Sequence, residues 1–402
     1  MQAIVLAAGE SSRFWPLNQR HKSLFKIIGK PLICYLIDGL KKTGLKEVII
    51  VQSPKKDIEE ELKNSQYRDL RYVVQKRPLG TGDALLAAEK FIKDNFFVLN
   101  SERVDCQDYL KLILEKSKAI LLSAPTKTPW LFGNLKIKGD KVLDIIEKPK
   151  KNIFSNFKNV GFYFLPKEFF NYLKKIPVHP YSLIKAFSKY AKQKELKTVK
   201  IQKEPLSLKY PWDLFDINEY LLKKIKTKIK GKIERNCQIS GPVIVEKGSL
   251  LKSGTYIEGP VYIGKNCEIG PNCFIRKFSN IGNNCIIGNG VEIKNSIIGD
   301  NSKIPHLNYV GDSIIGENCN LGAGTILANF RFDGKTIKAL VKGEKVDTRR
   351  QKFGAVLGNN VKVGVNASLM PGVLIGSGCI IGPGETVFEN LKDNTKFYRQ
   401  RY

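Results

Sequence analysis

The chain lacks the features that mark membrane, secreted and zinc-binding proteins. No apolar run reaches the ~18 residues that a membrane-spanning helix requires. The apolar first strand has no basic segment before it and runs directly into the polar loop of residues 9–13, unlike a signal peptide. None of the eight cysteines is spaced as Cys-x-x-Cys, so we expect reduced structural thiols rather than a zinc site. The sequence therefore predicts a cytoplasmic protein without a membrane partner.

Signatures of nucleic-acid binding are also missing, although the formal net charge is +29. The lysines are spread over both halves of the chain, and no segment resembles a helix-turn-helix or an RNA-binding motif. A positive surface also attracts small polyanionic substrates by electrostatic steering. We therefore interpret the charge as suited to phosphorylated substrates and expect no nucleic-acid partner.

The 402 residues favour two domains, and the first reads as an α/β fold. Short buried strands are predicted at residues 1–7, 47–51, 71–74, 96–99 and 119–123. Amphipathic helices are predicted at residues 31–42, 56–63, 82–93, 107–116, 167–175, 182–192 and 213–226. This alternation is typical of a Rossmann-like parallel sheet covered on both faces, with ligands beyond the carboxyl ends of the strands. We expect the first domain to span residues 1–228.

The second domain, residues 229–402, is marked by an aliphatic residue at every sixth position. The first run consists of Ile233, Ile239, Val245, Leu251, Ile257, Ile263, Ile269, Ile275, Ile281, Ile287 and Ile293, and the second of Leu357, Val363, Leu369, Ile375, Ile381 and Val387. A period of six predicts a parallel β-helix with three short strands in each coil, because each strand sends one aliphatic side chain inward.

The rhythm is disturbed between the two runs, and the disturbed stretch contains His306, one of only three histidines. A regular stack of coils needs no histidine, so His306 is a candidate for chemistry; a solvated loop histidine is the alternative. Residues 328–356 form a basic insertion, which we expect to project from one coil as a loop.

Short polar motifs follow the strands of the first half. The segment Gly9-Glu10-Ser11-Ser12-Arg13 offers backbone N–H groups, hydroxyls and a guanidinium to a triphosphate. Downstream come Lys22, Gln75, Gly80-Thr81-Gly82, Ser101-Glu102, Glu147-Lys148-Pro149 and Asn159-Val160-Gly161. In this order the motifs resemble the sugar-1-phosphate nucleotidyltransferase family over residues 1–225, with the family's opening pattern Leu-Ala-Ala-Gly-x-Gly-x-Arg.

The resemblance implies transfer of a nucleotidyl group from a nucleoside triphosphate to a sugar 1-phosphate, with release of pyrophosphate. It assigns the phosphates to Arg13 and Lys22, the nucleotide to Leu6, Ala8, Gly9, Gln75, Gly80 and Thr81, and the sugar to Gly133, Glu147, Lys148 and Asn159. It also implies Mg²⁺. Where the family has Gly-Asp this chain has Ser101-Glu102, so Glu102 is the expected metal ligand, with Asp105 as the alternative. Asp213 is the expected second ligand, with Asn218 as the alternative.

The stretch His306-Leu307-Asn308-Tyr309-Val310-Gly311-Asp312 resembles another known pattern. With Ile315 to Thr325 it looks like the acetyltransferase half of the bifunctional glucosamine-1-phosphate acetyltransferase/N-acetylglucosamine-1-phosphate uridyltransferase family, over residues 231–390. This implies a left-handed β-helix, acetyl-CoA as co-substrate and a homotrimer or a multiple of trimers. It assigns the catalytic base to His306, the acceptor to Arg276, Lys294, Tyr309 and Asn320, and acetyl-CoA to Ala323, with Arg349 and Arg350 as partners for the CoA phosphates.

The residue types suit acyl transfer to an amine. A neutral imidazole can take the proton that an ammonium group must lose before it attacks a thioester. Arg276 and Lys294 are three hexads apart, so they are expected on one face, one coil apart, where both can bind one phosphate.

The favoured hypothesis is a bifunctional enzyme that makes UDP-N-acetylglucosamine or a related nucleotide sugar. One alternative is a nucleotidyltransferase for glucose or mannose 1-phosphate with a purely structural β-helix. Another is a regulatory subunit that senses nucleotide sugars without turnover. The sequence does not distinguish the nucleoside triphosphates, nor glucosamine from galactosamine.

Overall fold

The computed structural model describes residues 1–45, 47–113 and 119–398. Two compact units share these residues. The first comprises Met1–Glu10, Ser23–Phe25 and Pro31–Ser207, and the second comprises Ser11–Lys22, Lys26–Lys30 and the chain from Leu208 onward. Two short pieces of the amino-terminal half therefore belong to the second unit.

The first unit is built on one sheet with the strand order β5-β4-β1-β6-β10-β7-β11-β9-β8. Its strands are β1 (Gln2–Ala7), β4 (Glu47–Gln52), β5 (Arg71–Val74), β6 (Phe96–Asn100), β7 (Ala119–Pro125), β8 (Gly133–Lys138), β9 (Lys141–Glu147), β10 (Phe157–Leu165) and β11 (Leu196–Lys200). The five predicted strands are confirmed. The expected parallel sheet is mixed, because β10 runs antiparallel to both β6 and β7.

Helices cover both faces of this sheet, as predicted. They are α1 (Leu32–Lys42), α2 (Asp57–Leu62), α3 (Thr81–Ala87), α4 (Cys106–Leu110), α5 (Phe169–Lys174) and α6 (Ser182–Gln193), with 3-10 turns η2 (Lys22–Leu24), η3 (Glu89–Phe91) and η4 (Pro129–Leu131). Val5 of β1 packs into the core that contains Leu36 of α1, whereas Ile4 packs into the core that contains Phe169 of α5. Because successive side chains of β1 point to opposite faces, the strand is buried on both.

Three predicted helices end differently from the expectation. The helix expected at residues 82–93 ends at Ala87 and continues as the short turn η3. The helix expected at 107–116 ends at Leu110, and its residues 114–116 lie outside the described part of the chain. The helix expected at 213–226 is the 3-10 turn η5 (Pro211–Asp213) followed by α7 (Leu214–Leu222), both in the second unit.

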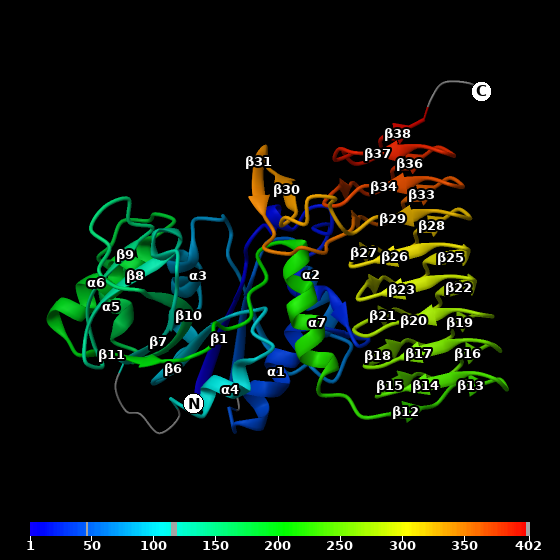
Figure 1. Ribbon diagram of the computed structural model, residues 1–402. Helices are drawn as coiled ribbons and strands as arrows, with labels where there is room; N and C mark the ends of the chain where they lie inside the picture. Colours follow the sequence, from blue (N-terminus) through cyan, green and yellow to red (C-terminus); the bar gives the residue numbers. More distant parts are fainter. Residues whose placement is uncertain (46, 114–118, 399–402) are drawn as a thin grey trace. The chain divides into compact units, whose positions relative to one another are not determined.

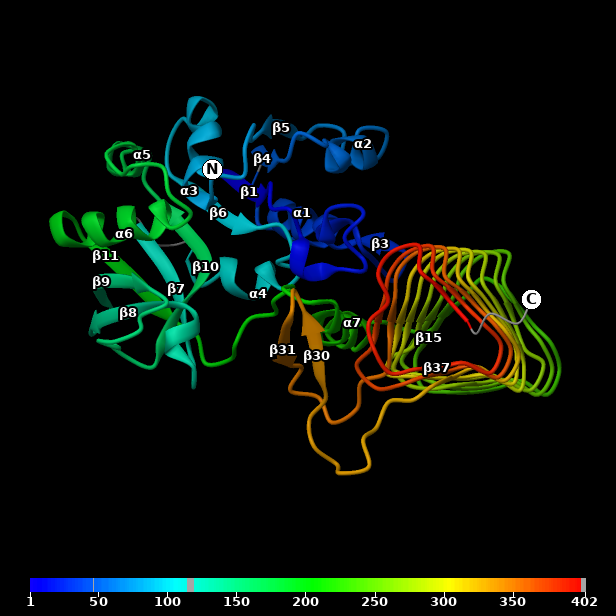
Figure 2. The ribbon, with the colours of Figure 1, turned by 90° about the horizontal axis from the view of Figure 1, so that it is seen from above.

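The second unit is a parallel β-helix of three sheets, whose coils stack one above another (Figure 1) and form a triangle when seen along the stack (Figure 2). The first sheet contains β12 (Lys228–Ile229), β15 (Val243–Val245), β18 (Val261–Ile263), β21 (Asn280–Ile281), β24 (Ile297–Ile298), β27 (Ile314–Ile315), β32 (Val356–Leu357) and β35 (Leu374–Ile375). The second contains β13 (Lys232–Ile233), β16 (Leu250–Leu251), β19 (Glu268–Ile269), β22 (Ile286–Asn289), β25 (Lys303–His306), β28 (Asn320–Leu321), β33 (Lys362–Val363), β36 (Ile380–Ile381) and β38 (Lys396–Phe397). The third contains β14 (Gln238–Ser240), β17 (Tyr256–Glu258), β20 (Phe274–Ile275), β23 (Glu292–Lys294), β26 (Tyr309–Gly311), β29 (Ile326–Leu327), β34 (Ser368–Leu369) and β37 (Thr386–Val387).

The aliphatic side chains that recur at every sixth position fill the core of this β-helix. The hexad residues from Val245 to Val387 are buried in a single cluster, together with the cysteines of the corners. All eight cysteines are free thiols, as expected. Burial raises the pKa of Cys273 to about 11, which keeps this thiol protonated near neutral pH.

The disturbed stretch around His306 is more regular than predicted. Ile275 pairs with Ile293, 18 residues on, whereas Ile281 pairs with Ile298, 17 residues on. One residue is thus missing from the corner after Lys294, and the shortened coil length continues through the pairing of Ile298 with Ile315. The disturbed rhythm reflects this shorter coil, and His306 itself ends a regular strand, β25.

The insertion is more ordered than the expected loop. It carries an antiparallel hairpin of β30 (Lys338–Val341) and β31 (Glu344–Asp347), drawn in orange in Figure 1. Phe353, near the end of the insertion, is fully buried, and the chain then continues into β32 of the β-helix. The two amino-terminal pieces of this unit contain the 3-10 turn η1 (Ser12–Phe14) and β2 (Lys26–Ile27), which pairs with β3 (Lys30–Pro31).

Candidate functional site

His306 lies at the outer surface of the β-helix, at the carboxyl end of β25. Its carbonyl oxygen accepts a hydrogen bond from Gly324 N at 3.2 Å, and its own N–H donates to Asn308 Oδ1 at 3.3 Å. The buried Asn308 in turn donates from Nδ2 to Gly322 O at 2.7 Å. The backbone of His306 is therefore fixed to the next coil, while the imidazole is exposed to solvent and to any ligand there.

Arg276 and Lys294 lie on neighbouring coils, as their spacing predicted. Arg276 N donates to Ile293 O at 2.8 Å, which places the two cationic residues in adjacent register positions. Arg276 Nη1 lies 2.9 Å from Glu292 Oε1. Lys294 Nζ lies 3.7 Å from Asp312 Oδ2.

Asp312 is the buried centre of a polar column formed by Asn295, Asp312 and Asn329, which occupy the same corner of three successive coils. Asn295 Nδ2 donates to Asp312 Oδ1 at 2.7 Å, and Asn329 Nδ2 donates to Asp312 Oδ2 at 2.6 Å. Asn329 Nδ2 also lies 3.2 Å from the hydroxyl oxygen of Tyr309. Tyr309 and Lys294 are therefore tied to one buried carboxylate, and burial raises the pKa of Tyr309.

Lys352 is a third cationic group near this site, and the sequence patterns did not identify it. Desolvation lowers the pKa of Lys294; the carboxylate of Asp312 opposes this shift, whereas the charges of Lys352 and Arg276 add to it. Three cations thus gather beside two carboxylates, those of Asp312 and Glu292, which leaves an excess of positive charge. Such an excess of positive charge suits a phosphate dianion. Lys352 lies near the end of the insertion, and no multiple of six relates it to Lys294.

Asn320 and Ala323 lie on the coil that follows His306, whereas Arg349 and Arg350 lie in the insertion. Asn320 begins β28 and is exposed, and the carbonyl oxygen of Ala323 accepts a hydrogen bond from Asn366 N at 2.8 Å. Arg350 is held by helix α7, since its Nη2 lies 2.5 Å from Asp216 Oδ1 and its Cζ lies 5.1 Å from the centre of the Phe215 ring. Arg349 is oriented separately, with a left-handed φ of 60° and its N–H donating to Asp347.

In the first unit, the segments after β1 and β6 lie side by side. Leu6 near the end of β1 accepts a hydrogen bond from Ser101 N at 3.2 Å. Gln75 is buried and donates from Nε2 to Gly80 O at 3.1 Å and to Asp83 Oδ2 at 2.7 Å. Gln75 therefore fixes the turn at the start of α3, which presents Gly80 and Thr81.

Three of the predicted sugar-site residues converge. Gly133 pairs with Glu147, and a methyl group added at Gly133 would stand 3.1 Å from Glu147 Oε2 and 3.4 Å from Asn159 Cβ. Asn159 donates from Nδ2 to the hydroxyl oxygen of Tyr163 at 2.8 Å and accepts from Gly161 N at 3.0 Å. Burial raises the pKa of Glu147. Lys148 follows with a φ of 45°, and its Nζ lies 5.7 Å from the centre of the Tyr181 ring.

Arg13, Lys22 and Asp213 belong to the second unit. Lys22 Nζ donates to Leu208 O at 2.5 Å, and its backbone N–H donates to Ser11 Oγ at 3.2 Å. Asp213 Oδ2 accepts hydrogen bonds from the backbone N–H groups of Lys209 at 2.6 Å and Tyr210 at 2.9 Å. Burial raises the pKa of Asp213 to about 6, and the charge of Lys22 works against this rise.

The candidate Mg²⁺ ligands differ in accessibility. The alternatives Asp105 and Asn218 are buried; Asp105 Oδ2 accepts from Leu206 N, and Asn218 Nδ2 donates to Phe278 O. Glu102 and Asp213 are only partly buried. Within the described ranges, no group of three or more His, Cys, Asp or Glu side chains could hold a metal ion. Mg²⁺ in phosphate chemistry is commonly held by one or two carboxylates together with substrate phosphates, and Glu102 and Asp213 each offer the carboxylate oxygens that it prefers.

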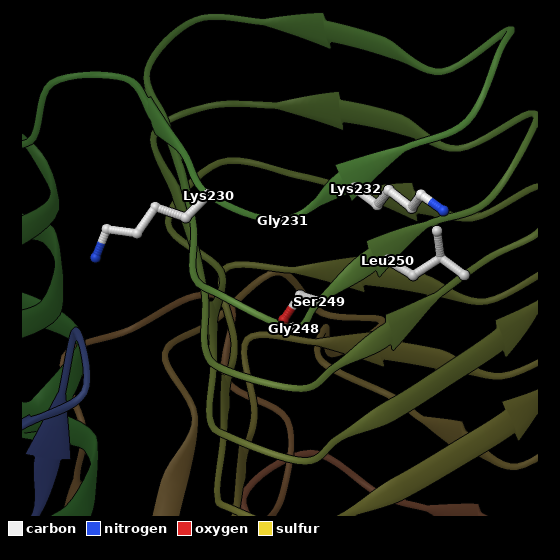
Figure 3. A pocket seen from close by; sticks show the side chains of 6 residues that line it. All are labelled: Lys230, Gly231, Lys232, Gly248, Ser249 and Leu250. Atoms are coloured by element: carbon white, nitrogen blue, oxygen red, sulfur yellow. The ribbon is translucent and has the colours of Figure 1, made fainter.

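An open depression of about 350 Å³ lies on the first coils, lined by Lys230, Gly231, Lys232, Gly248, Ser249 and Leu250 (Figure 3). Its strands β13 and β16 are separated from β25 by β19 and β22 in the same sheet. It therefore lies away from His306, and we assign it no role. Across the ranges that the structure describes, no helix is both long and apolar enough to cross a membrane.

Comparisons with known proteins cover the whole chain. The nucleotidyl transferase family matches residues 2–212, the GMPPB C-terminal domain matches residues 257–364, and the bacterial transferase hexapeptide (six repeats) matches residues 354–384. A "Bifunctional protein GlmU" of Methanococcus maripaludis is 42% identical over 100% of this chain and 98% of its own length. One from Methanocaldococcus jannaschii is 38% identical over the same shares. A "Bifunctional sugar-1-phosphate nucleotidylyltransferase/acetyltransferase" of Sulfurisphaera tokodaii is 37% identical over 96% of this chain and 97% of its own.

Proposed function

The chain belongs to the family of bifunctional sugar-1-phosphate nucleotidylyltransferase/acetyltransferases, and on this basis we propose that it makes UDP-N-acetylglucosamine, or a closely related nucleotide sugar, from glucosamine 1-phosphate. It is an enzyme of nucleotide-sugar synthesis that combines nucleotidyl transfer with acetyl transfer. Its substrates are a nucleoside triphosphate, a sugar 1-phosphate and acetyl-CoA. The observation that carries the choice of an amino-sugar phosphate is the group of Arg276, Lys294 and Lys352 on the coils next to the exposed His306.

In acetyl transfer, the three cations bind the phosphate of glucosamine 1-phosphate, and Tyr309 and Asn320 contact its sugar. His306 takes a proton from the ammonium group, and the free amine attacks the thioester carbon of acetyl-CoA. The C–S bond breaks, the sulfur leaves as a thiolate and takes up a proton, and the amide remains on the sugar. Ala323 meets the thioester through its backbone, and Arg349 and Arg350 are the partners proposed for the CoA phosphates.

In nucleotidyl transfer, a phosphate oxygen of the sugar 1-phosphate attacks the α-phosphorus of the triphosphate, and pyrophosphate leaves. Leu6, Ala8, Gly9, Gln75, Gly80 and Thr81 hold the nucleotide, and Gly133, Glu147, Lys148 and Asn159 hold the sugar. Arg13 and Lys22 neutralise the phosphates, since this chemistry depends on positioning and charge neutralisation. Glu102 and Asp213 would hold Mg²⁺, which when bound adds positive charge on the phosphates.

We further propose a homotrimer or a multiple of trimers in the cytoplasm. By function, residues 1–228 form the nucleotidyltransferase domain and residues 229–402 the acetyltransferase domain, although two amino-terminal pieces pack with the second.

Two assays on the purified protein test the proposal. Acetyl-CoA with glucosamine 1-phosphate should release CoA thiol, and UTP with Mg²⁺ and N-acetylglucosamine 1-phosphate should release pyrophosphate. Pyrophosphate without thiol would contradict the acetyl acceptor proposed here. Thiol without pyrophosphate, with thymidine and guanosine triphosphates also tried, would contradict the proposed nucleotidyl transfer.

A further inference from the structure

The segment that carries Lys22 and directly follows Arg13 runs along the outside of the β-helix. Its residues contact four levels of the stack in order, from the last coils towards the middle. Trp15 Nε1 donates to Asp393 Oδ1 at 3.2 Å, and Asn359 Nδ2 donates to Gln19 Oε1 at 2.7 Å. Further along, Lys26 Nζ lies 3.1 Å from Asp300 Oδ2, and Ile28 N donates to Asn280 Oδ1 at 2.8 Å. We call residues 15–22 and 26–29, which belong to the second unit, the strap.

The spacing of these contacts matches an extended chain laid along the stack. Asn359 and Asp393 are two coils apart, because Ser377 occupies the coil between them. Coils stack at about 4.8 Å, so the two levels are about 10 Å apart. The five residues from Trp15 to Gln19 can span this distance without being fully stretched.

The β-helix holds its side of these contacts rigidly. Asp300 Oδ1 accepts from Asn283 N at 2.8 Å, Asn359 Oδ1 accepts from Glu317 N at 2.9 Å, and Asp393 Oδ1 accepts from Ser377 N at 2.8 Å. Each side chain is thus bound to the backbone of a neighbouring coil at one corner of the triangle. The strap therefore rests on fixed acceptors and donors rather than on freely rotating surface side chains.

The end of the strap approaches the β-helix so closely that a side chain is excluded. Gly29 has a φ of +67°, and a Cβ at this position would stand 2.4 Å from the hydroxyl oxygen of the buried Tyr262. Such an approach of backbone to a packed side chain requires glycine. The strap is thus fitted to the β-helix by shape as well as by hydrogen bonds.

We propose that Asp393 and Asn359 are positioning residues for nucleotidyl transfer, because they hold the strap and with it Arg13 and Lys22. The inference rests on the proposed roles of Arg13 and Lys22 in binding the triphosphate. A loop that is already ordered loses less conformational entropy when it binds its ligand, so these contacts favour triphosphate binding. The last coils of the β-helix then serve the nucleotidyl reaction in addition to supporting the acetyl-transfer site.

The test compares Asp393→Ala, Asn359→Ala and their double variant with the wild-type protein. We expect the KM for the nucleoside triphosphate in pyrophosphate release to rise about three- to tenfold for each hydrogen bond removed. The rate at saturating triphosphate should change less, and thiol release from acetyl-CoA should stay at the wild-type level. Asp393→Asn keeps a carbonyl oxygen for both Trp15 and Ser377, so it should restore the KM.

Glu317→Ala is the matched control. Glu317 lies on the same corner in the coil between Asp300 and Asn359, it is exposed, and within the described residues its carboxylate makes no hydrogen bond to the strap. Its KM for the triphosphate should equal that of the wild type.

The outcomes separate the two levels of the proposal. If the wild-type protein releases no pyrophosphate, the proposed function fails. If it does, and the alanine variants keep the wild-type KM, the positioning role is wrong. The role is also wrong if the alanine variants lose thiol release to the same extent, since the residues would then support the fold in general.

Discussion

Asp312 and Lys294 lie 3.7 Å apart, measured from Oδ2 to Nζ, and the carboxylate is almost fully buried whereas the ammonium group is partly exposed. Two asparagine amides, from Asn295 and Asn329, donate to the same carboxylate. The buried carboxylate of Asp312 thus connects its coil to the two neighbouring coils through Asn295 and Asn329. It also holds the partly exposed ammonium group of Lys294.

The first prediction concerns this carboxylate. Asp312→Ala leaves the buried amide of Asn329 and the partly buried amide of Asn295 without their acceptor, so the free energy of unfolding should fall by about 3 kcal/mol. Urea unfolding measures the loss. Asp333→Ala removes an exposed carboxylate that pairs with Arg331, and it should change the stability by less than about 0.5 kcal/mol. Equal stability of the two variants would contradict the role of Asp312.

The second prediction concerns the three cations. Arg276→Ala, Lys294→Ala and Lys352→Ala should each raise the KM for glucosamine 1-phosphate in thiol release by about tenfold or more, because each removes a charge-assisted contact to phosphate. With glucosamine, which has no phosphate, as the acceptor, the three variants should release thiol at the same rate as the wild-type protein. Lys277→Ala removes a neighbouring exposed lysine that pairs with Glu258 and should leave the KM unaltered. A wild-type KM for glucosamine 1-phosphate in Lys352→Ala would show that Lys352 does not bind the phosphate.

The third prediction concerns the metal. Treatment with EDTA should abolish pyrophosphate release while thiol release continues, because only nucleotidyl transfer is proposed to use Mg²⁺. Glu102→Ala should behave like the chelated wild-type protein even at high Mg²⁺. Thiol release that stops with EDTA, or a Glu102→Ala variant with full pyrophosphate release, would show that the assignment is wrong.

The sequence predicted well what local periodicity determines. Inward-facing aliphatic residues such as Ile275 and Ile293 recur because every coil needs them, and their spacing placed Arg276 and Lys294 on neighbouring coils. The antiparallel strands β8 to β10 were missed, since their lysines and glycines weaken the strand pattern. The contact between Trp15 and Asp393 could not be predicted, because no pattern connects residues 378 positions apart.

The central claim is that one chain transfers acetyl groups through His306 and nucleotidyl groups through a separate site. The most direct measurement compares thiol release and pyrophosphate release in wild-type protein and in His306→Ala. Thiol release should fall by about 10²- to 10⁴-fold, because a general base is lost, while pyrophosphate release from UTP and N-acetylglucosamine 1-phosphate stays at the wild-type rate. Thiol release at the wild-type rate in His306→Ala would contradict the account.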